Sequence, residues 1–145
     1  MSEVSRKNLS RTIAKLVPNI IQGAQLGFLA SRDITHTQFF ILIAIHSKTH
    51  CTMKTLADNM SVSMPTISGT VDRLVKAHYV ERVDNPDDRR QVMVGLTKEG
   101  QKLIAQFQEA VGHRWEEVLN ILNQKELESL QLVIMKLIQG LEKKE

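Results

Sequence analysis

The sequence predicts a mostly α-helical protein of one domain, interrupted by one small β-hairpin. Its 145 residues are a common length for a single domain with its own core. Only three prolines and seven glycines occur, whereas an all-β fold needs many turns rich in these residues. Apolar residues recur at helical spacing over most of the chain, and one short segment alternates with a period of two instead.

The first predicted helix extends to about residue 30. Its apolar stripe is formed by Leu9, Ile13, Leu16 and Ile20, spaced four, three and four residues apart. Pro18 lies inside this pattern, so we expect a kink or a local break there.

Capping residues mark the next three helices. Thr35 and Gln38 have the spacing of a capping box, which predicts a helix beginning at residue 36. Thr52 can cap a short helix that ends near residue 60, and Ser63 can cap another that ends near residue 77. Pro65 is compatible with the second helix because it falls in the first turn.

Two short strands are predicted after these helices. The first is Tyr79–Val83, and the second contains the alternating residues Val92, Val94 and Leu96. The turn residues Asn85-Pro86-Asp87-Asp88 lie between them, so the two strands form a hairpin.

Helical periodicity returns after Thr97 and continues to the end of the chain. Its first stripe consists of Ile104, Phe107, Val111, Trp115, Val118 and Leu122. Asn123 and Glu126 form a second capping box, which predicts a last helix. The apolar residues of that helix, at spacings of three and four, are Leu127, Leu130, Ile134, Leu137 and Leu141. This seam needs a partner helix, either in the same chain or in a second copy.

The order of two short helices and a hairpin is that of a winged helix-turn-helix. In this module the second helix enters the major groove of DNA, and the hairpin tip can reach the minor groove. Small hydroxyls and an apolar tip at the start of the second helix suit base edges: Ser63, Met64, Thr66 and Ser68. The cations suited to phosphates or grooves are Lys54, Arg73, Lys76, Arg89 and Arg90.

The charge distribution agrees with a polyanionic partner for the first part of the chain. Residues 1–102 carry 14 basic and 9 acidic side chains, whereas residues 103–145 carry 5 and 7. With one Trp, one Tyr and four Phe, the chain is poor in the stacking residues that bind single strands. We therefore expect duplex DNA as the partner.

A set of short motifs runs through the predicted helix-turn-helix and wing: Leu56-Ala57, Ser61-Val62-Ser63, Pro65-Thr66, Val71-Asp72-Arg73-Leu74 and Asp88-Arg89-Arg90, with Val94, Leu96-Thr97 and Gly100. In these motifs the sequence resembles the multiple-antibiotic-resistance regulator (MarR) family of transcription factors over about residues 35–104. The resemblance implies an obligate homodimer with interleaved first and last helices. It also implies a repressor that binds a pseudo-palindromic operator and is released by a small aromatic or phenolic ligand.

The resemblance implies roles for three residues. Arg90 enters the minor groove, Asp88 steadies the wing through charge-assisted hydrogen bonds, and Arg73 contacts DNA from the reading helix. Many members of the family have an arginine where this chain has Gly69. Either the backbone approaches DNA closely at Gly69, or specificity depends on Thr66, Ser68 and the wing. The candidate DNA-binding residues are thus Lys54, Ser63, Met64, Thr66, Ser68, Gly69, Arg73, Asp88, Arg89 and Arg90.

The expected organisation follows from these assignments. Residues 1–34 and 123–145 would form the dimerisation helices, residues 35–100 the winged helix-turn-helix, and residues 98–122 a connecting helix. A ligand at the junction of the dimer helices and the reading head would change the spacing of two reading helices. The candidate lining of that site is Lys15, Gln22, His36 and Phe40.

Alternative interpretations concern the histidines, the cysteine and the tryptophan. His46, His50 and Cys51 are spaced like a soft-metal cluster, although a histidine at a helix C-terminus is more often a cap. Cys51 is an alternative oxidant sensor. Trp115 either packs in the core or lines the ligand site. We predict no metal and no cofactor.

Other functional classes lack support in the sequence. It has no Gly-rich phosphate loop, HExxH, paired CxxC or G-x-S-x-G motif, so we do not expect an enzyme. It has no apolar run long enough to span a bilayer and no secretory signal pattern, and its single cysteine fits a reducing compartment. We therefore expect a cytoplasmic protein. The alternative function is a helical protein-interaction module with a degenerate winged helix.

Overall fold

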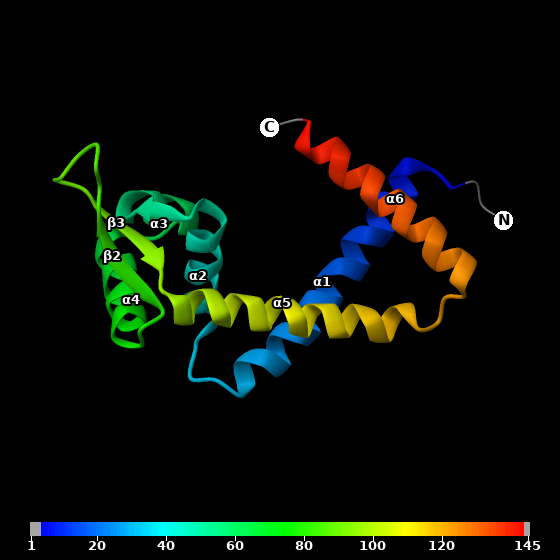
Figure 1. Ribbon diagram of the computed structural model, residues 1–145, viewed down its shortest axis with the longest axis horizontal. Helices are drawn as coiled ribbons and strands as arrows, with labels where there is room; N and C mark the ends of the chain where they lie inside the picture. The colour runs from blue at the N-terminus through cyan, green and yellow to red at the C-terminus, as the bar shows by residue number, and fades with distance from the viewer. Residues whose placement is uncertain (1–3, 144–145) are drawn as a thin grey trace. The chain divides into compact units, whose positions relative to one another are not determined.

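The computed structural model describes residues 4–143 as a helical protein with one small antiparallel sheet (Figure 1). The predicted fold class is therefore confirmed. In chain order, the elements are α1 (Arg6–Ala30), α2 (His36–Lys48), β1 (His50–Thr52), α3 (Met53–Met60), α4 (Met64–Lys76), β2 (Val80–Asp84), β3 (Val92–Leu96), α5 (Lys98–Leu119) and α6 (Gln124–Glu142). They form two compact units, the first ending at Val111 and the second beginning at Gly112. None of the helices in the described residues is long and apolar enough to cross a membrane.

Helix α1 continues without interruption through Pro18, so a break at this residue is wrong. Proline removes the hydrogen bond that its nitrogen would donate to the carbonyl of Ala14. Ala14 and Pro18 are both exposed. Water can therefore hydrogen-bond to the freed carbonyl, and the helix continues past the proline.

The predicted capping residues begin the other short helices. Thr35 Oγ1 accepts the N–H of Gln38 at 3.2 Å, and the Gln38 side chain accepts the N–H of Thr35 at 2.9 Å. Thr52 and Ser63 cap α3 and α4, and Asn123 forms the second capping box at the start of α6. These local hydrogen bonds satisfy the free N–H groups of each first turn, which fixes where the helices begin.

The sheet has three strands, which corrects the prediction of a simple two-stranded hairpin. Residues of β1 pair with β3, and the strand order is β1-β3-β2, all antiparallel. Cys51 of β1 and Arg82 of β2 both lie opposite Val94 of β3. Strand β2 begins at Val80 and not at the predicted Tyr79. The inner half of the wing is therefore hydrogen-bonded on both sides of β3.

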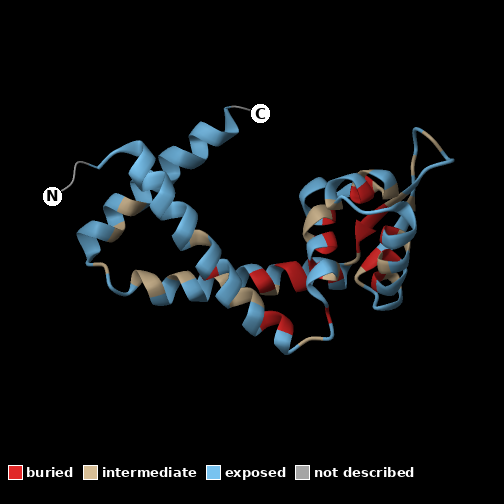
Figure 2. Ribbon diagram, turned by 180° about the vertical axis from the view of Figure 1, so that it is seen from behind, coloured by how far each residue is buried: buried red, intermediate tan, exposed pale blue. Residues whose placement is uncertain are grey.

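The core of the first unit is apolar, and Figure 2 shows its buried residues concentrated in the winged part. The largest fully buried side chains are Phe39, Ile41, Leu42, Ile45, Leu56, Ile67, Leu74, Ile104, Val71, Val80 and Val94. Three aromatic rings link α1, α2 and α5: the Phe107 ring lies 5.4 Å from that of Phe28 and 4.6 Å from that of Phe39. Both contacts are edge-to-face, a favourable arrangement for aromatic pairs. This core gives the winged part a rigid base.

Glycine is required at position 100, where α5 leaves the sheet. Thr97 donates its N–H to the Tyr79 carbonyl at 3.1 Å, and Thr97 Oγ1 accepts the N–H of Gly100 at 3.0 Å. A Cβ atom on Gly100 would lie only 2.1 Å from the Tyr79 carbonyl oxygen. No residue with a side chain fits so close to the Tyr79 carbonyl without a shift of the backbone.

Helix α6 leaves its apolar stripe uncovered in the single chain. No described residue of α6 is buried. Its exposed large apolar side chains are Leu132, Val133, Ile134, Met135, Leu137, Ile138 and Leu141. Monomeric soluble proteins rarely expose so many neighbouring apolar side chains, so the stripe indicates an interface. Helix α5 ends at Leu119, before the predicted stripe residue Leu122.

Candidate nucleic-acid interface

Helices α3 and α4 meet at a tight turn formed by Ser61 and Val62. Ser61 has a left-handed backbone with φ 53° and donates its N–H to the Asp58 carbonyl at 3.1 Å. Val62 donates to the Ala57 carbonyl at 3.1 Å. Apolar residues of both helices are buried in the same cluster. The turn and the shared core hold α3 and α4 as a helix-turn-helix.

The N-terminus of α4 carries four of the predicted reading residues. The hydroxyls of Ser63 and Thr66 lie 2.8 Å apart, and Ser63 Oγ also accepts the N–H of Thr66. Ser63 therefore supports the first turn of the helix. Met64 is 47% exposed, Thr66 is exposed and Ser68 is half-buried. Met64 and Thr66 thus offer an apolar tip and a small polar group to a ligand.

Further along α4, residues three or four positions apart form one exposed face: Thr66, Gly69, Arg73 and Lys76. In the part of the chain that the structure describes, the guanidinium of Arg73 has no carboxylate partner. Its neighbour Asp72 pairs with Arg82 instead. An unpaired guanidinium on this face can bind an anion such as a phosphate.

Asp72 forms an ion pair with Arg82 of β2, which sequence reasoning missed. The pair joins the exposed side of α4 to the base of the wing. The two side chains are 53% and 42% exposed, so the pair adds little to stability. The pair links two elements whose relative position is fixed by the buried core that Val71, Leu74 and Val80 share. No local pattern could reveal it, because the partners lie ten residues apart on different elements.

The wing tip is ordered by side chains that accept main-chain hydrogen bonds. Asn85 Oδ1 accepts the N–H of Asp87 at 3.0 Å, and Asp88 Oδ1 accepts the N–H of Arg90 at 3.0 Å. Asp88 is half-buried, whereas Arg89 and Arg90 are exposed. The tip therefore presents two cations on a turn that its own carboxylate stabilises.

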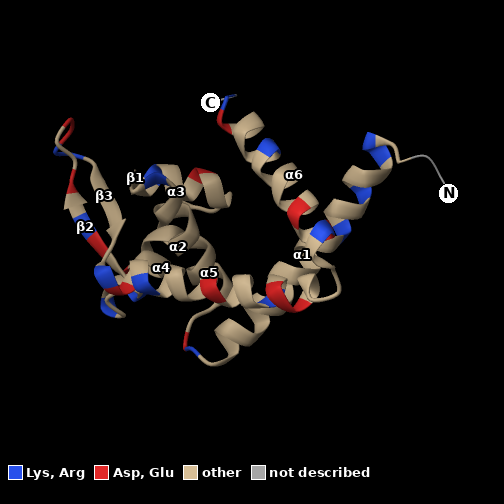
Figure 3. Ribbon diagram, turned by 45° about the vertical axis from the view of Figure 1, so that its right-hand side comes forward, with Lys and Arg blue, Asp and Glu red and all other residues tan. Residues whose placement is uncertain are grey.

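Lys and Arg side chains occur on both helices of the helix-turn-helix and on the hairpin. Figure 3 shows Lys and Arg residues on the hairpin, on α3 and on α4. Lys54 is exposed in the first turn of α3. The structure thus gives every predicted cation of the helix-turn-helix and wing access to solvent.

The four residues predicted to line a ligand site remain uncovered. Lys15 and Gln22 lie on α1, and His36 and Phe40 lie in the first turns of α2. All four are exposed, and Phe40 is 51% exposed. A single chain therefore does not enclose a ligand with these residues, and a second chain would have to supply the cover.

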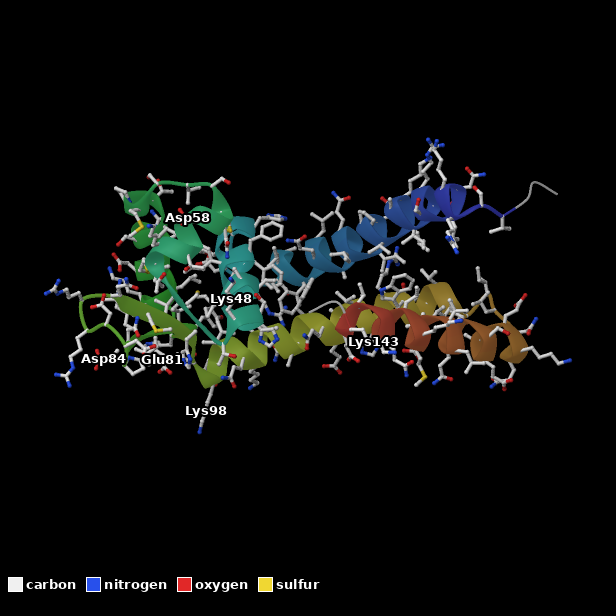
Figure 4. The ribbon with its side chains drawn as sticks, turned by 90° about the horizontal axis from the view of Figure 1, so that it is seen from above. Lys48, Asp58, Glu81, Asp84, Lys98 and Lys143 are labelled. Carbon is white, nitrogen blue, oxygen red and sulfur yellow. The ribbon has the colours of Figure 1, made fainter. Side chains whose placement is uncertain are left out.

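The alternative cluster of His46, His50 and Cys51 is not formed as a helix face. His46 lies on α2, whereas His50 and Cys51 belong to β1. Cys51 is buried, and this burial raises the pKa of its thiol, although the nearby charge of Lys48 lowers it. Figure 4 labels Lys48 at the end of α2. Among the residues described, no three His, Cys, Asp or Glu side chains are placed to hold a metal ion.

The two histidines instead border a shallow pocket of about 410 Å³, lined by His46, Thr49, His50, Glu81, Leu96 and Gln101. His50 lies opposite Gly95 in the sheet. A Cβ atom on Gly95 would come within 2.7 Å of His50 Cδ2, so the imidazole covers the glycine. His50 therefore has a packing role. Trp115, the other residue with two interpretations, is half-buried.

Comparison with known proteins agrees with this geometry. The sequence model of the MarR family matches residues 34–92, which include the helix-turn-helix and the wing tip. The multiple antibiotic resistance protein MarR of Escherichia coli (strain K12) is 32% identical over 112 residues, covering 77% of this chain and 78% of that protein. The transcriptional regulator FarR of Neisseria gonorrhoeae is 28% identical over 99 residues, covering 68% of each chain.

Solved structures share the fold along almost the whole chain. The transcriptional regulator Tm0710 from Thermotoga maritima has a TM-score of 0.85 at 22% identity, covering 95% of this chain and 96% of its own. A mutant of E. coli MarR complexed with operator DNA has a TM-score of 0.57 at 29% identity, covering 92% and 99%. The likeness therefore extends beyond the winged module to the helices at both ends.

Proposed function

Since the chain belongs to the MarR family and is a DNA-binding transcriptional regulator, we propose that it acts as a homodimeric repressor on a pseudo-palindromic operator. The observation that carries the proposal is the exposed face of α4, with its unpaired Arg73, joined to a wing that holds Arg89 and Arg90 exposed. The alternative of a protein-interaction module is not favoured, because similar proteins such as FarR are named as transcriptional regulators and a solved structure of an E. coli MarR mutant contains operator DNA.

Helix α4 would read the major groove. Met64 and Thr66 suit the methyl group of thymine and the polar edges of bases, and Ser68 lies one turn from Met64. Ser63 would contribute mainly by capping the helix. Arg73 and, from α3, Lys54 would bind phosphates, which fixes the register of the protein on the duplex without reading its sequence.

The wing would contact the adjacent minor groove. A guanidinium fits the narrow, electronegative groove of A·T-rich DNA better than an ammonium does, because it is planar and weakly hydrated. Arg90 would enter the groove while Arg89 binds the flanking backbone. Asp88 would keep the turn in the shape that directs both arginines outward.

The dimer would bury the apolar stripes of the terminal helices. Exposed apolar residues of α1 are Leu9, Ile13, Leu16, Ile21 and Leu26, and α6 exposes the stripe described above. We assign residues 1–34 and 123–145 to dimerisation, residues 35–100 to DNA binding and residues 98–122 to the connection. Two copies would place two α4 helices about one or two DNA turns apart, at roughly 34 Å per turn.

A small aromatic or phenolic ligand would release the operator. Lys15 or His36 would meet the acidic group of the ligand, and Gln22 and Phe40 would contact its ring, with the second chain closing the site. A tenfold loss of operator affinity requires the ligand to prefer the DNA-incompetent spacing by about 1.4 kcal/mol.

The test is selection of genomic DNA fragments by the purified chain, combined with light scattering of the free protein. We expect a dimer at micromolar concentration and a small set of fragments that share an inverted repeat. A folded monomer would remove the dimer from the proposal. Recovery of fragments without a common sequence would contradict binding to a specific operator.

A further inference from the structure

We propose that Gly69 determines part of the sequence preference, because its missing side chain lets a base edge approach the backbone of α4. The inference rests on the proposed function, since it assumes that α4 enters the major groove. It assigns to this glycine a role that the folded chain alone does not require.

Folding gives no reason for a glycine at position 69. Glycine destabilises the interior of a helix relative to alanine. Gly69 has no positive φ, and a Cβ atom built on it would meet nothing within 4 Å. Gly95 and Gly100 also lack a positive φ, but a Cβ atom there would lie 2.7 Å from His50 and 2.1 Å from Tyr79, so packing requires these two glycines. The chain therefore keeps a destabilising residue where alanine would fit.

The position of Gly69 on α4 suggests what the glycine serves. It lies at the middle of the exposed face, three residues after Thr66 and four before Arg73. Ile67 and Val71, two residues before and after Gly69, are buried and hold the helix on the core. Side chains on either side of Gly69 thus surround a stretch of bare backbone that faces solvent.

A bare stretch of helix backbone accepts a group that a side chain would displace. In the major groove the protruding group of a base pair is the C5-methyl of thymine. Glycine is the residue that lets a backbone approach a ligand closely. We therefore assign to Gly69 a steric selection for the base pair beneath it, with Thr66 and Arg73 contacting the DNA on either side.

Gly112 provides a matched control. It lies in α5, is exposed and, like Gly69, has nothing within 4 Å of an added Cβ. Gly69→Ala and Gly112→Ala should each raise the melting temperature by roughly 2–8 °C, because both remove a helix-interior glycine. Any difference between the two variants in DNA binding is then separate from folding.

The experiment begins with duplexes that contain a randomised segment of about 20 base pairs, or two helical turns. The unaltered chain selects its preferred duplex, and fluorescence anisotropy then gives the affinity of each protein for this duplex and for its single-base-pair variants. We expect Gly69→Ala to bind the preferred duplex about 5- to 100-fold more weakly. Gly69→Leu should bind more weakly still, and Gly112→Ala should match the unaltered chain.

The loss of affinity in Gly69→Ala should also depend on one base pair of the duplex. Substitution of the base pair nearest Gly69 should weaken the unaltered chain strongly and Gly69→Ala little, while other base pairs keep their effects. Equal affinity and equal base-pair preferences for Gly69→Ala and the unaltered chain would overturn the inference, as would equal losses for Gly69→Ala and Gly112→Ala. Failure of the unaltered chain to select any duplex would overturn the proposed function as well.

Discussion

The carboxylate of Asp88 accepts the main-chain N–H of Arg90 at 3.0 Å across the tip of the wing. The Asp88 carbonyl also accepts the N–H of Gln91 at 3.0 Å. These two bonds hold the backbone on both sides of Arg90, while the arginine side chain remains exposed. The tip therefore separates two tasks: Asp88 shapes the turn, and Arg90 is left to bind.

Arg90→Ala should weaken operator binding by about 1–3 kcal/mol, the size of one good groove contact. The melting temperature and the dimer should be unchanged, because the Arg90 side chain packs against nothing in the core. Anisotropy with the selected duplex measures the loss. Arg114→Ala is the control, since Arg114 is an exposed arginine of α5 that pairs with Glu117. Unchanged affinity of Arg90→Ala at physiological salt would remove the wing from the mechanism.

Two substitutions can separate the hydrogen-bond acceptor of Asp88 from its negative charge. Asp88→Asn keeps the Oδ1 acceptor of the turn, whereas Asp88→Ala removes it. We expect Asp88→Ala to lose about 0.5–1.5 kcal/mol of operator affinity, the net value of a typical hydrogen bond, and Asp88→Asn to lose little or none. Equal losses in the two variants would mean that the negative charge, and not the hydrogen bond, is what the wing requires.

Gly100→Ala should destabilise the fold by about 1–3 kcal/mol, because its Cβ would lie 2.1 Å from the Tyr79 carbonyl oxygen and the backbone must move to admit it. Urea denaturation measures the change. Gly112→Ala, in the same helix but without a clash, should be as stable as the unaltered chain or more so. A Gly100→Ala variant of unaltered stability would contradict the close contact.

Cys51 should be inert in the folded protein. Burial raises the pKa of its thiol, so the thiol stays protonated at neutral pH, and the thiolate is the reactive form. Iodoacetamide should modify the folded chain slowly and the urea-unfolded chain rapidly, as measured by mass spectrometry. DNA binding should be insensitive to hydrogen peroxide. Rapid alkylation of the folded chain, or peroxide-dependent release of DNA, would restore the oxidant-sensor alternative.

Features set by neighbouring residues could be predicted from the sequence. The capping boxes of Thr35 with Gln38 and of Asn123 with Glu126 need only three residues of separation, and both form as expected. The reading helix and the wing could also be predicted, because capping residues, alternating apolar residues and turn residues follow one another at short spacings in the sequence.

Features that depend on distant residues could not be predicted. Strand β1 has three residues between two helices, and only its pairing with β3 makes it a strand. The ion pair of Asp72 with Arg82 needs the fold to bring α4 and β2 together. Of the kink or local break expected at Pro18, the break does not occur, because water can reach the carbonyl that loses its hydrogen bond.

The central claim is tested most directly by measuring the affinity for the selected duplex and for a scrambled duplex over a range of salt concentrations. Binding through several phosphates makes the logarithm of the association constant fall linearly with the logarithm of the salt concentration. At physiological salt, the selected duplex should bind at least about 10³-fold more tightly than a duplex of the same composition in scrambled order. Equal affinity for the two duplexes, or no binding to either, would contradict a sequence-specific regulator.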